Sequence, residues 1–169
     1  MEIFRFSSLA ILGLIISCSP EKSYTFELPT NAMELLSGDS SKTWILARRF
    51  NNKTRMNMGD CFLAYAQTFR PDGTMNDNAG ENRDCGETLN ASWRFIKSQD
   101  NKFYLRLEGN QVAELLNIEE DFKHLKILAL SDTLMTLQFS HKQFSNKATQ
   151  ITDFWVPEGT KVEDRFFHW

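Results

Sequence analysis

Most of the chain consists of short segments in which apolar and polar residues alternate, separated by turn-forming residues. In 103–108, for example, Phe103, Leu105 and Leu107 occupy every second position, so they share one face of a strand. The same alternation predicts strands at 43–50, 61–69, from 74 onward, and at 91–97, 103–108, 111–118, 122–130, 133–140 and 149–156. About eight short strands with turn signals at intervals of about 8–12 residues are typical of a sandwich or an up-and-down barrel. We therefore predict an all-β fold, a small antiparallel barrel whose interior is filled by side chains or holds one small ligand.

Turn and capping residues mark the ends of several of these elements. The tripeptide Pro-Asp-Gly at 71–73 predicts a turn, because proline presets φ, aspartate bonds back to the backbone, and glycine accepts a positive φ. A short N-terminal helix is expected to begin at Asn31, where Glu34 stands in capping-box register, and to end at Gly38. For 111–122 a short helix is the alternative to a strand.

The start of the chain has the features of a bacterial export signal. Arg5 supplies a weak positive charge, and 10–16 is almost wholly apolar but shorter than the roughly 20 residues that span a membrane. The sequence Ile-Ile-Ser-Cys at 15–18 resembles the lipobox of bacterial lipoproteins, whose cysteine is lipidated and becomes the first residue after cleavage. The alternatives are an ordinary signal peptide with an incidental cysteine, Cys18, or a short buried helix.

The lipobox resemblance implies a domain plan and a cellular address. Residues 1–17 are then the signal peptide, 18–30 a lipid-anchored tether, and 31–169 the barrel domain. Lipid on Cys18 exceeds the two signals that stable membrane anchoring requires, so the membrane is one expected partner. Ser19 stands where an aspartate would favour retention at the inner membrane. The resemblance therefore implies the outer membrane, at its periplasmic or cell-surface face.

Two cysteines remain once Cys18 is assigned to lipid. Cys61 and Cys85 form an even pair in an oxidising compartment, so we predict a disulfide between them. Redox catalysis would favour a C-x-x-C spacing, and metal binding would favour nearby histidines; neither pattern is present around these cysteines. Closing a loop of about 25 residues is expected to stabilise the fold by roughly 3–4 kcal/mol.

Composition narrows the class of protein and of partner. The formal net charge is −3, and the sequence lacks the basic patch expected of a nucleic-acid-binding protein. Fourteen Phe and four Trp, against eight Gly and four Pro, indicate an aromatic-rich β protein and not a disordered chain.

The order of several motifs resembles the bacterial lipocalin-like lipoproteins, especially those of Bacteroidota. A helical turn, Leu-Leu-Ser-Gly at 35–38, is followed by Lys-Thr-Trp-Ile-Leu at 42–46. Next come a cysteine, an aromatic strand with a Phe-x-x-Asp-Gly-Thr turn at 69–74, a second cysteine, and the strand Ser-Trp-Arg-Phe at 92–95. The segment 126–137 is similar to the family's penultimate hairpin, so the resemblance covers nearly the whole barrel domain.

This resemblance implies a lipocalin-like barrel with four fold-signature residues, Trp44, Trp93, Asp72 and Gly73. In lipocalins the first-strand tryptophan packs across the closed end of the barrel under a basic side chain, and Trp44 matches that residue. Arg94 or Arg106 is expected to supply the cation, in a contact worth about 0.5–2 kcal/mol. The alternative for Trp44 is an ordinary core tryptophan.

No catalytic or metal site can be assembled from the sequence. His124, His141 and His168 are scattered, whereas a zinc site needs three or four converging ligands. No serine stands in a nucleophile elbow. Four acidic residues are interpreted as solvated turn carboxylates and not as a calcium site: Asp60, Asp72, Asp84 and Glu87. We therefore predict a protein that is not an enzyme and has no cofactor or metal.

Two hypotheses for function follow. In the first, the barrel binds a small apolar or amphipathic ligand. In the second, the barrel is filled and the protein is a structural or interaction module that docks on an envelope protein as an accessory subunit or inhibitor. Its docking surface would be the loops or the C-terminal aromatics Phe166, Phe167 and Trp169. The volume inside the barrel distinguishes the two hypotheses.

Overall fold

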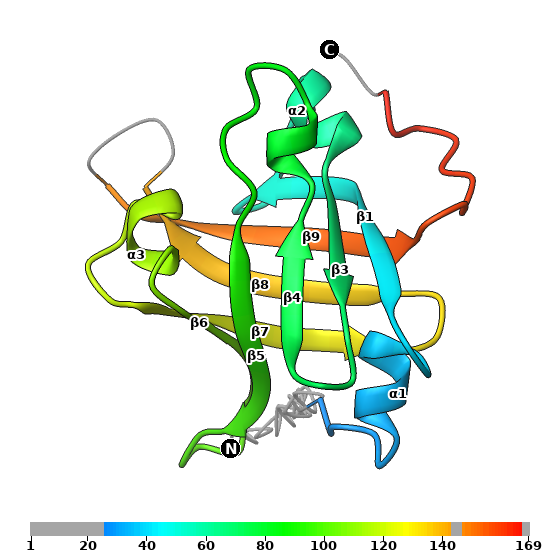
Figure 1. Cartoon of the computed structure of the whole chain (residues 1–169), viewed down its shortest axis with the longest axis vertical. Coiled ribbons are helices and arrows are strands. Elements are labelled where there is room, and N and C mark those ends of the chain that lie inside the picture. The colour runs from blue at the N-terminus through cyan, green and yellow to red at the C-terminus, as the bar shows by residue number, and fades with distance from the viewer. Residues whose placement is uncertain (1–25, 143–146, 167–169) are drawn as a thin grey trace, which may run out of the picture.

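The protein is a closed antiparallel barrel with short helices at its ends (Figure 1). A computed structural model describes residues 26–142 and 147–166. The expected signal peptide at 1–17, Cys18 and His168 lie outside the described residues. The elements are α1 Ala32–Ser37, β1 Lys42–Asn51, β2 Thr54–Arg55, α2 Asp60–Ala64, β3 Ala66–Phe69, β4 Thr74–Asp77, the 3₁₀ helix η1 Ala79–Glu81, β5 Asn90–Lys97, β6 Phe103–Glu108, α3 Val112–Leu115, β7 Phe122–Leu130, β8 Met135–His141 and β9 Thr149–Pro157.

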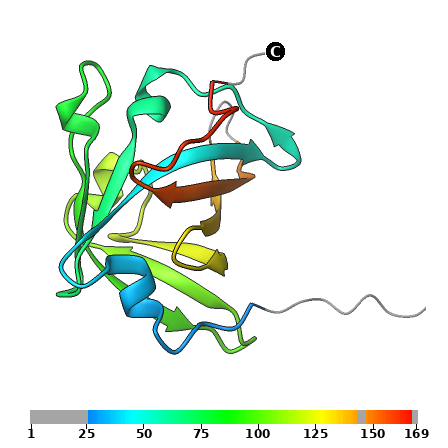
Figure 2. The same ribbon diagram turned by 90° about the vertical axis from the view of Figure 1, so that its right-hand side faces the viewer.

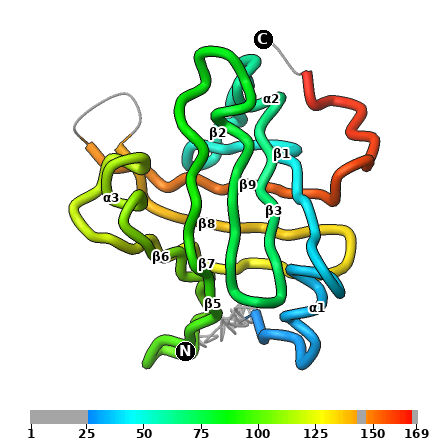
Figure 3. The backbone as a smooth tube through the Cα atoms, in the orientation of Figure 1, coloured from blue at the N-terminus to red at the C-terminus, as the bar shows by residue number. Residues whose placement is uncertain are grey.

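The strands pair in the order β2-β1-β3-β4-β5-β6-β7-β8-β9, and a further pairing of β1 with β9 closes the sheet on itself. Every pairing is antiparallel, and Figure 3 follows the chain from each strand to its neighbour. The two-residue β2 extends the sheet beside the end of β1, so eight strands form the closed barrel. The prediction of a small all-β barrel with about eight antiparallel strands and a short N-terminal helix is confirmed.

Helix α1 covers one end of the barrel, and α2 lies at the opposite end (Figures 1 and 2). Trp44 on β1 is completely buried at the end that α1 covers, which is the closed end of the barrel. Its Nε1 donates a hydrogen bond of 2.8 Å to the carbonyl of Leu36 in α1. Asn31 occupies the N-cap position, but its side chain makes no capping hydrogen bond, so the capping-box prediction is wrong. Gly38 ends the helix with φ of 62°.

A lysine, and not an arginine, provides the cation above Trp44. Lys42 Nζ lies 4.3 Å from the centre of the Trp44 ring and donates to the carbonyls of Leu35 and Asp132 at 2.9 and 2.8 Å. The prediction that Arg94 or Arg106 fills this position is wrong. Those two arginines lie on the outer face of β5 and β6, where both contact Glu108, whereas Lys42 precedes Trp44 by two residues on one strand.

The turn at 71–73 forms as the sequence predicts. The backbone N–H and the hydroxyl of Thr74 both donate to Asp72 Oδ1, at 2.9 and 2.7 Å, and these contacts lower the pKa of the Asp72 carboxyl. Gly73 has φ of 83°, a conformation that a residue with a Cβ rarely adopts. Its carbonyl accepts from the Trp93 backbone N–H at 2.7 Å, and Trp93 Nε1 donates to the Thr74 carbonyl at 3.0 Å. The turn therefore fixes the position of Trp93.

Two of the predicted strands are partly or wholly helical. The predicted strand at 61–69 divides into α2 and the shorter β3. Asn78 Oδ1 accepts from the Ala66 N–H, and Asn78 Nδ2 donates to the Ala64 carbonyl. These side-chain bonds replace the backbone hydrogen bonds with which the pairing of β3 and β4 would continue. The segment after Gly109 forms α3, which confirms the helical alternative for 111–122 and rejects the strand. The predicted disulfide between Cys61 and Cys85 is confirmed, and it ties α2 to the loop after η1.

Candidate functional site

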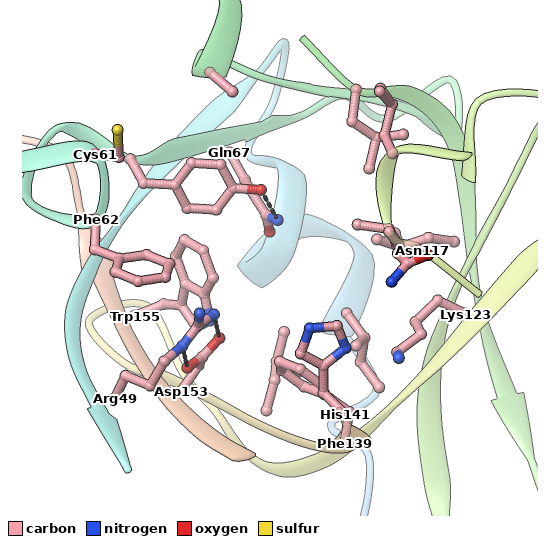
Figure 4. Close-up of a pocket in the computed structure, with 18 of the residues that line it drawn as sticks. Arg49, Cys61, Phe62, Gln67, Asn117, Lys123, Phe139, His141, Asp153 and Trp155 are labelled. Carbon is pink, nitrogen blue, oxygen red and sulfur yellow. Dashed lines mark hydrogen bonds and ion pairs between the residues drawn. The ribbon is translucent and has the colours of Figure 1, made fainter. Parts of the chain in front are cut away.

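A cavity of about 480 Å³ opens at the end of the barrel opposite α1 (Figure 4). This volume falls in the range of roughly 300–1,000 Å³ that is usual for small-ligand sites. Its walls include Leu107, Leu125 and Leu137 from the inner faces of β6, β7 and β8. Phe62 of α2 and Leu115 of α3 add apolar surface near the mouth. The cavity is therefore largely apolar and accessible from one end.

Strand alternation explains which side chains reach the cavity. On β8, Leu137 and His141 are four residues apart and share the inner face with Phe139 between them. On β7, Leu125 and Lys123 share the inner face in the same way. Along both strands the inner face therefore changes from leucine inside the barrel to a basic side chain at the rim.

A β-bulge places a charged side chain inside the barrel. The register of β1 against β9 shifts between Leu46 and Arg48, so Ala47 is the extra residue. Without this insertion the alternation from Leu46 would direct Arg48 inward; with it, Arg49 points inward and lies opposite Asp153 of β9. The bulge thus decides which of two adjacent arginines lines the cavity.

Arg49 and Asp153 form a buried, two-point ion pair. Arg49 Nε donates to Asp153 Oδ1 and Arg49 Nη2 donates to Oδ2, both at 2.6 Å (Figure 4). Asp153 is only 2% exposed, and burial raises the pKa of its carboxyl while the Arg49 hydrogen bonds act in the opposite direction. The guanidinium also lies 4.6 Å from the centre of the Phe62 ring. Each partner compensates the charge of the other.

The hydroxyl of Tyr65, beside Trp155, is the centre of a second hydrogen-bonded polar cluster in the wall. The Tyr65 hydroxyl donates to Asp77 Oδ2 at 2.9 Å and accepts from Gln67 Nε2 at 3.1 Å. Burial, followed by the charge of Asp77, raises the pKa of the Tyr65 hydroxyl far above its usual value, so it stays protonated. Among the described residues, Gln67 Oε1 and Trp155 Nε1 are buried without a hydrogen-bond partner. Such atoms are unusual in folded proteins.

The side of the cavity that faces Tyr65 and Trp155 carries positive charge. Lys123 Nζ donates to the carbonyl of Ser140 at 3.1 Å and lies 5.4 Å from the centre of the Phe139 ring. Burial lowers the pKa of Lys123, and the charge of Glu120 partly opposes this change. The pKa of His141 is also lowered, first by burial and then by the charges of Lys123 and Arg49. These two side chains point toward the cavity in Figure 4.

No family model matches this chain, and neither does any curated protein. The described part of the chain has no helix long and apolar enough to cross a membrane.

The structure brings few of the residues that the sequence singled out to the cavity. Cys61, Cys85 and His141 line it, whereas Trp44 lies in the closed end and His124 lies on the outer face beside Arg106. Within 26–142 and 147–166, no group of three or more His, Cys, Asp or Glu side chains is arranged to hold a metal ion. The four acidic residues considered for calcium, Asp60, Asp72, Asp84 and Glu87, are accordingly not such a group.

Sequence reasoning missed the charged residues of the cavity, although one signal was present. Asp153 alternates with Ile151 and Trp155, which places a carboxylate on the inner face of a strand. A buried carboxylate needs a partner, so this pattern alone implies a cation inside the barrel. The identity of that cation depends on the bulge in β1 and has no comparable signal in the sequence.

Proposed function

We propose that the protein is a non-catalytic binding protein, anchored by lipid in the bacterial outer membrane, whose barrel holds a small apolar or amphipathic molecule. The observation that carries the proposal is the cavity of about 480 Å³ at the open end of the barrel. Its size and leucine-rich wall suit such a ligand. The order of the motifs supports assignment to the lipocalin-like lipoproteins of Bacteroidota.

The ligand can be detected by comparing two masses of the protein purified from its own membrane. Under denaturing conditions the mass reports the chain and covalent lipid, and under native conditions it includes any molecule held in the cavity. We expect a larger native mass, and a smaller difference in Leu125→Trp, whose larger side chain narrows the cavity. Lys126→Trp is the matched control, because it adds the same side chain on the outer face of β7. Equal native and denatured masses for the unaltered protein would contradict ligand binding.

The lipid anchor is tested separately. The lipobox-like sequence at 15–18 supports lipidation of Cys18 after cleavage of 1–17. Cells given a palmitate analogue should incorporate the label into the protein, and Cys18→Ala should abolish it. Equal labelling of the two proteins would exclude Cys18 as the anchor.

A second function, docking on an envelope protein, has one observation in its favour. Phe166 is 71% exposed, and the preceding Asp164 is held against the barrel by Arg48 and Arg55 at 2.7 and 2.8 Å. An exposed aromatic in a fixed position suits a contact surface. Crosslinking in cells should then give adducts that are lost when 166–169 is removed. An unchanged adduct pattern would argue against this surface.

A further inference from the structure

The charged side chains around the cavity carry an excess of positive charge. Arg49, Lys123 and Lys142 line it, together with the titratable ring of His141. Asp153 is the one carboxylate among the described lining residues, and its two oxygens are bound to Arg49. Arg49 is therefore already compensated, and the remaining basic groups at the cavity have no carboxylate beside them in its wall.

Lys123 and His141 are the basic groups best placed to meet a ligand. Both are half-buried and stand at the rim of an inner face that continues inward as Leu125 on β7 and Leu137 on β8. A lysine ammonium has three N–H donors, and one of them on Lys123 is used by the Ser140 carbonyl. The remaining donors and the His141 ring are available to a group inside the cavity.

Both charged groups that act directly on His141 are positive. Lys123 faces it from β7, Arg49 from β1, and Lys142 follows it in the chain. Asp153 on β9 is bound to Arg49, and Asn117 beyond α3 is uncharged. Glu120 acts on Lys123 from the loop before β7. Protonation of His141 beside Lys123 and Arg49 is therefore unfavourable unless an anion binds between these groups.

We propose that the ligand is an anionic amphiphile with a single apolar chain. Its chain lies against Leu107, Leu125 and Leu137, and its negatively charged head group lies beside Lys123 and His141. This inference rests on the proposed function and specifies the chemistry of its ligand. A charged head group at this rim would gain charge-assisted hydrogen bonds, which are about twice as strong as neutral ones.

Three probes with the same chain separate the effect of charge from that of apolar burial. Calorimetric titration of the delipidated protein with dodecanoate, dodecanol and dodecyltrimethylammonium compares an anionic, a neutral and a cationic head group. We expect dodecanoate to bind about tenfold more tightly than dodecanol, and the cationic probe to bind more weakly than either. Equal affinity for dodecanoate and dodecanol would overturn the anionic head group but leave the proposed binding function intact. Failure of all three probes to bind would contradict the binding function itself.

Lys123→Met identifies the head-group contact. The variant keeps the apolar stem of the side chain, so we expect dodecanoate affinity to fall about tenfold and dodecanol affinity to change less than about twofold. Lys126→Met removes one charge from the outer face of the same strand and should leave both affinities unchanged. An equal loss for Lys123→Met and Lys126→Met would show that net charge, and not this site, attracts the anion.

His141 supplies an independent readout. Bound dodecanoate should raise the pKa of His141, measured from its ring proton shifts, whereas dodecanol should leave that pKa in place. The affinity for dodecanoate should also fall as the pH rises through the His141 pKa, and this dependence should disappear in His141→Gln. A His141 pKa that is unchanged by saturating dodecanoate would place the head group elsewhere.

Discussion

Arg49 and Asp153 lie directly opposite each other on β1 and β9, the two strands whose pairing closes the barrel, and their side chains share two hydrogen bonds of 2.6 Å. The pair stands inside the barrel because Ala47 is bulged out of the register. Closure of the sheet and charge compensation in the cavity wall therefore depend on the same few residues.

Removal of one member of the Arg49–Asp153 ion pair should destabilise the fold. Asp153→Ala leaves a buried guanidinium without its carboxylate, so we expect the free energy of unfolding to fall by about 3–5 kcal/mol. Urea denaturation followed by circular dichroism measures this change. The double variant Arg49→Met/Asp153→Leu replaces both charges with apolar groups and should recover most of the loss. A single variant within about 1 kcal/mol of the unaltered protein would contradict a role for the pair in closure.

The disulfide should stabilise the open end of the barrel. Cys61 and Cys85 are 24 residues apart, and Cys61→Ser/Cys85→Ser should lower the free energy of unfolding by about 3–4 kcal/mol. Urea denaturation with and without reductant provides the control, because reductant should affect the unaltered protein and not the double variant. Identical urea midpoints for the two proteins without reductant would show that this cross-link does not contribute to stability.

Lys42 should stabilise the closed end. Lys42→Met removes its hydrogen bonds to two carbonyls and its contact with the Trp44 ring, and we expect a loss of about 1–3 kcal/mol. Lys97 lies 5.1 Å from the Phe103 ring but is exposed, so Lys97→Met should cost less than about 1 kcal/mol. Thermal denaturation compares the two variants. An equal shift in Tm for both would show that the interactions at the closed end add nothing specific.

Stability should depend on pH through His141. Because burial, Lys123 and Arg49 lower its pKa below 6.5 in the folded protein, the unfolded chain binds a proton more readily. The free energy of unfolding should therefore fall as the pH decreases through 6.5 toward the folded pKa, and it should be recovered as the pH rises again. Urea midpoints measured between about pH 8 and pH 5 should fall less in His141→Gln than in the unaltered protein. Parallel curves for the two proteins would contradict this assignment.

The sequence predicts the regular part of the fold well because alternation and turn chemistry are local. The strand at 122–130 has the predicted limits, and the Pro-Asp-Gly turn at 71–73 forms as expected. The split of 61–69 into helix and strand was not predictable in this way. It depends on the Asn78 side chain, which replaces ladder hydrogen bonds from a neighbouring strand.

The site was harder to predict because its key contacts are long-range. Arg49 and Asp153 are 104 residues apart, and which arginine faces inward is decided by one inserted residue, Ala47. The sequence predicts the wrong cation above Trp44 for a related reason. The resemblance specified a basic side chain, but the face and height of each candidate on the barrel became clear only in three dimensions.

Methyl NMR during a dodecanoate titration tests the central claim, that the barrel is a binding site, most directly. Leu107, Leu125 and Leu137 line the cavity, whereas Leu36 packs in the closed end and Leu134 lies on the surface. We expect saturable shifts for the methyl groups of the three cavity leucines and little change for the other two. Shifts confined to surface methyl groups, or no saturable shift in the cavity leucines, would contradict ligand binding inside the barrel.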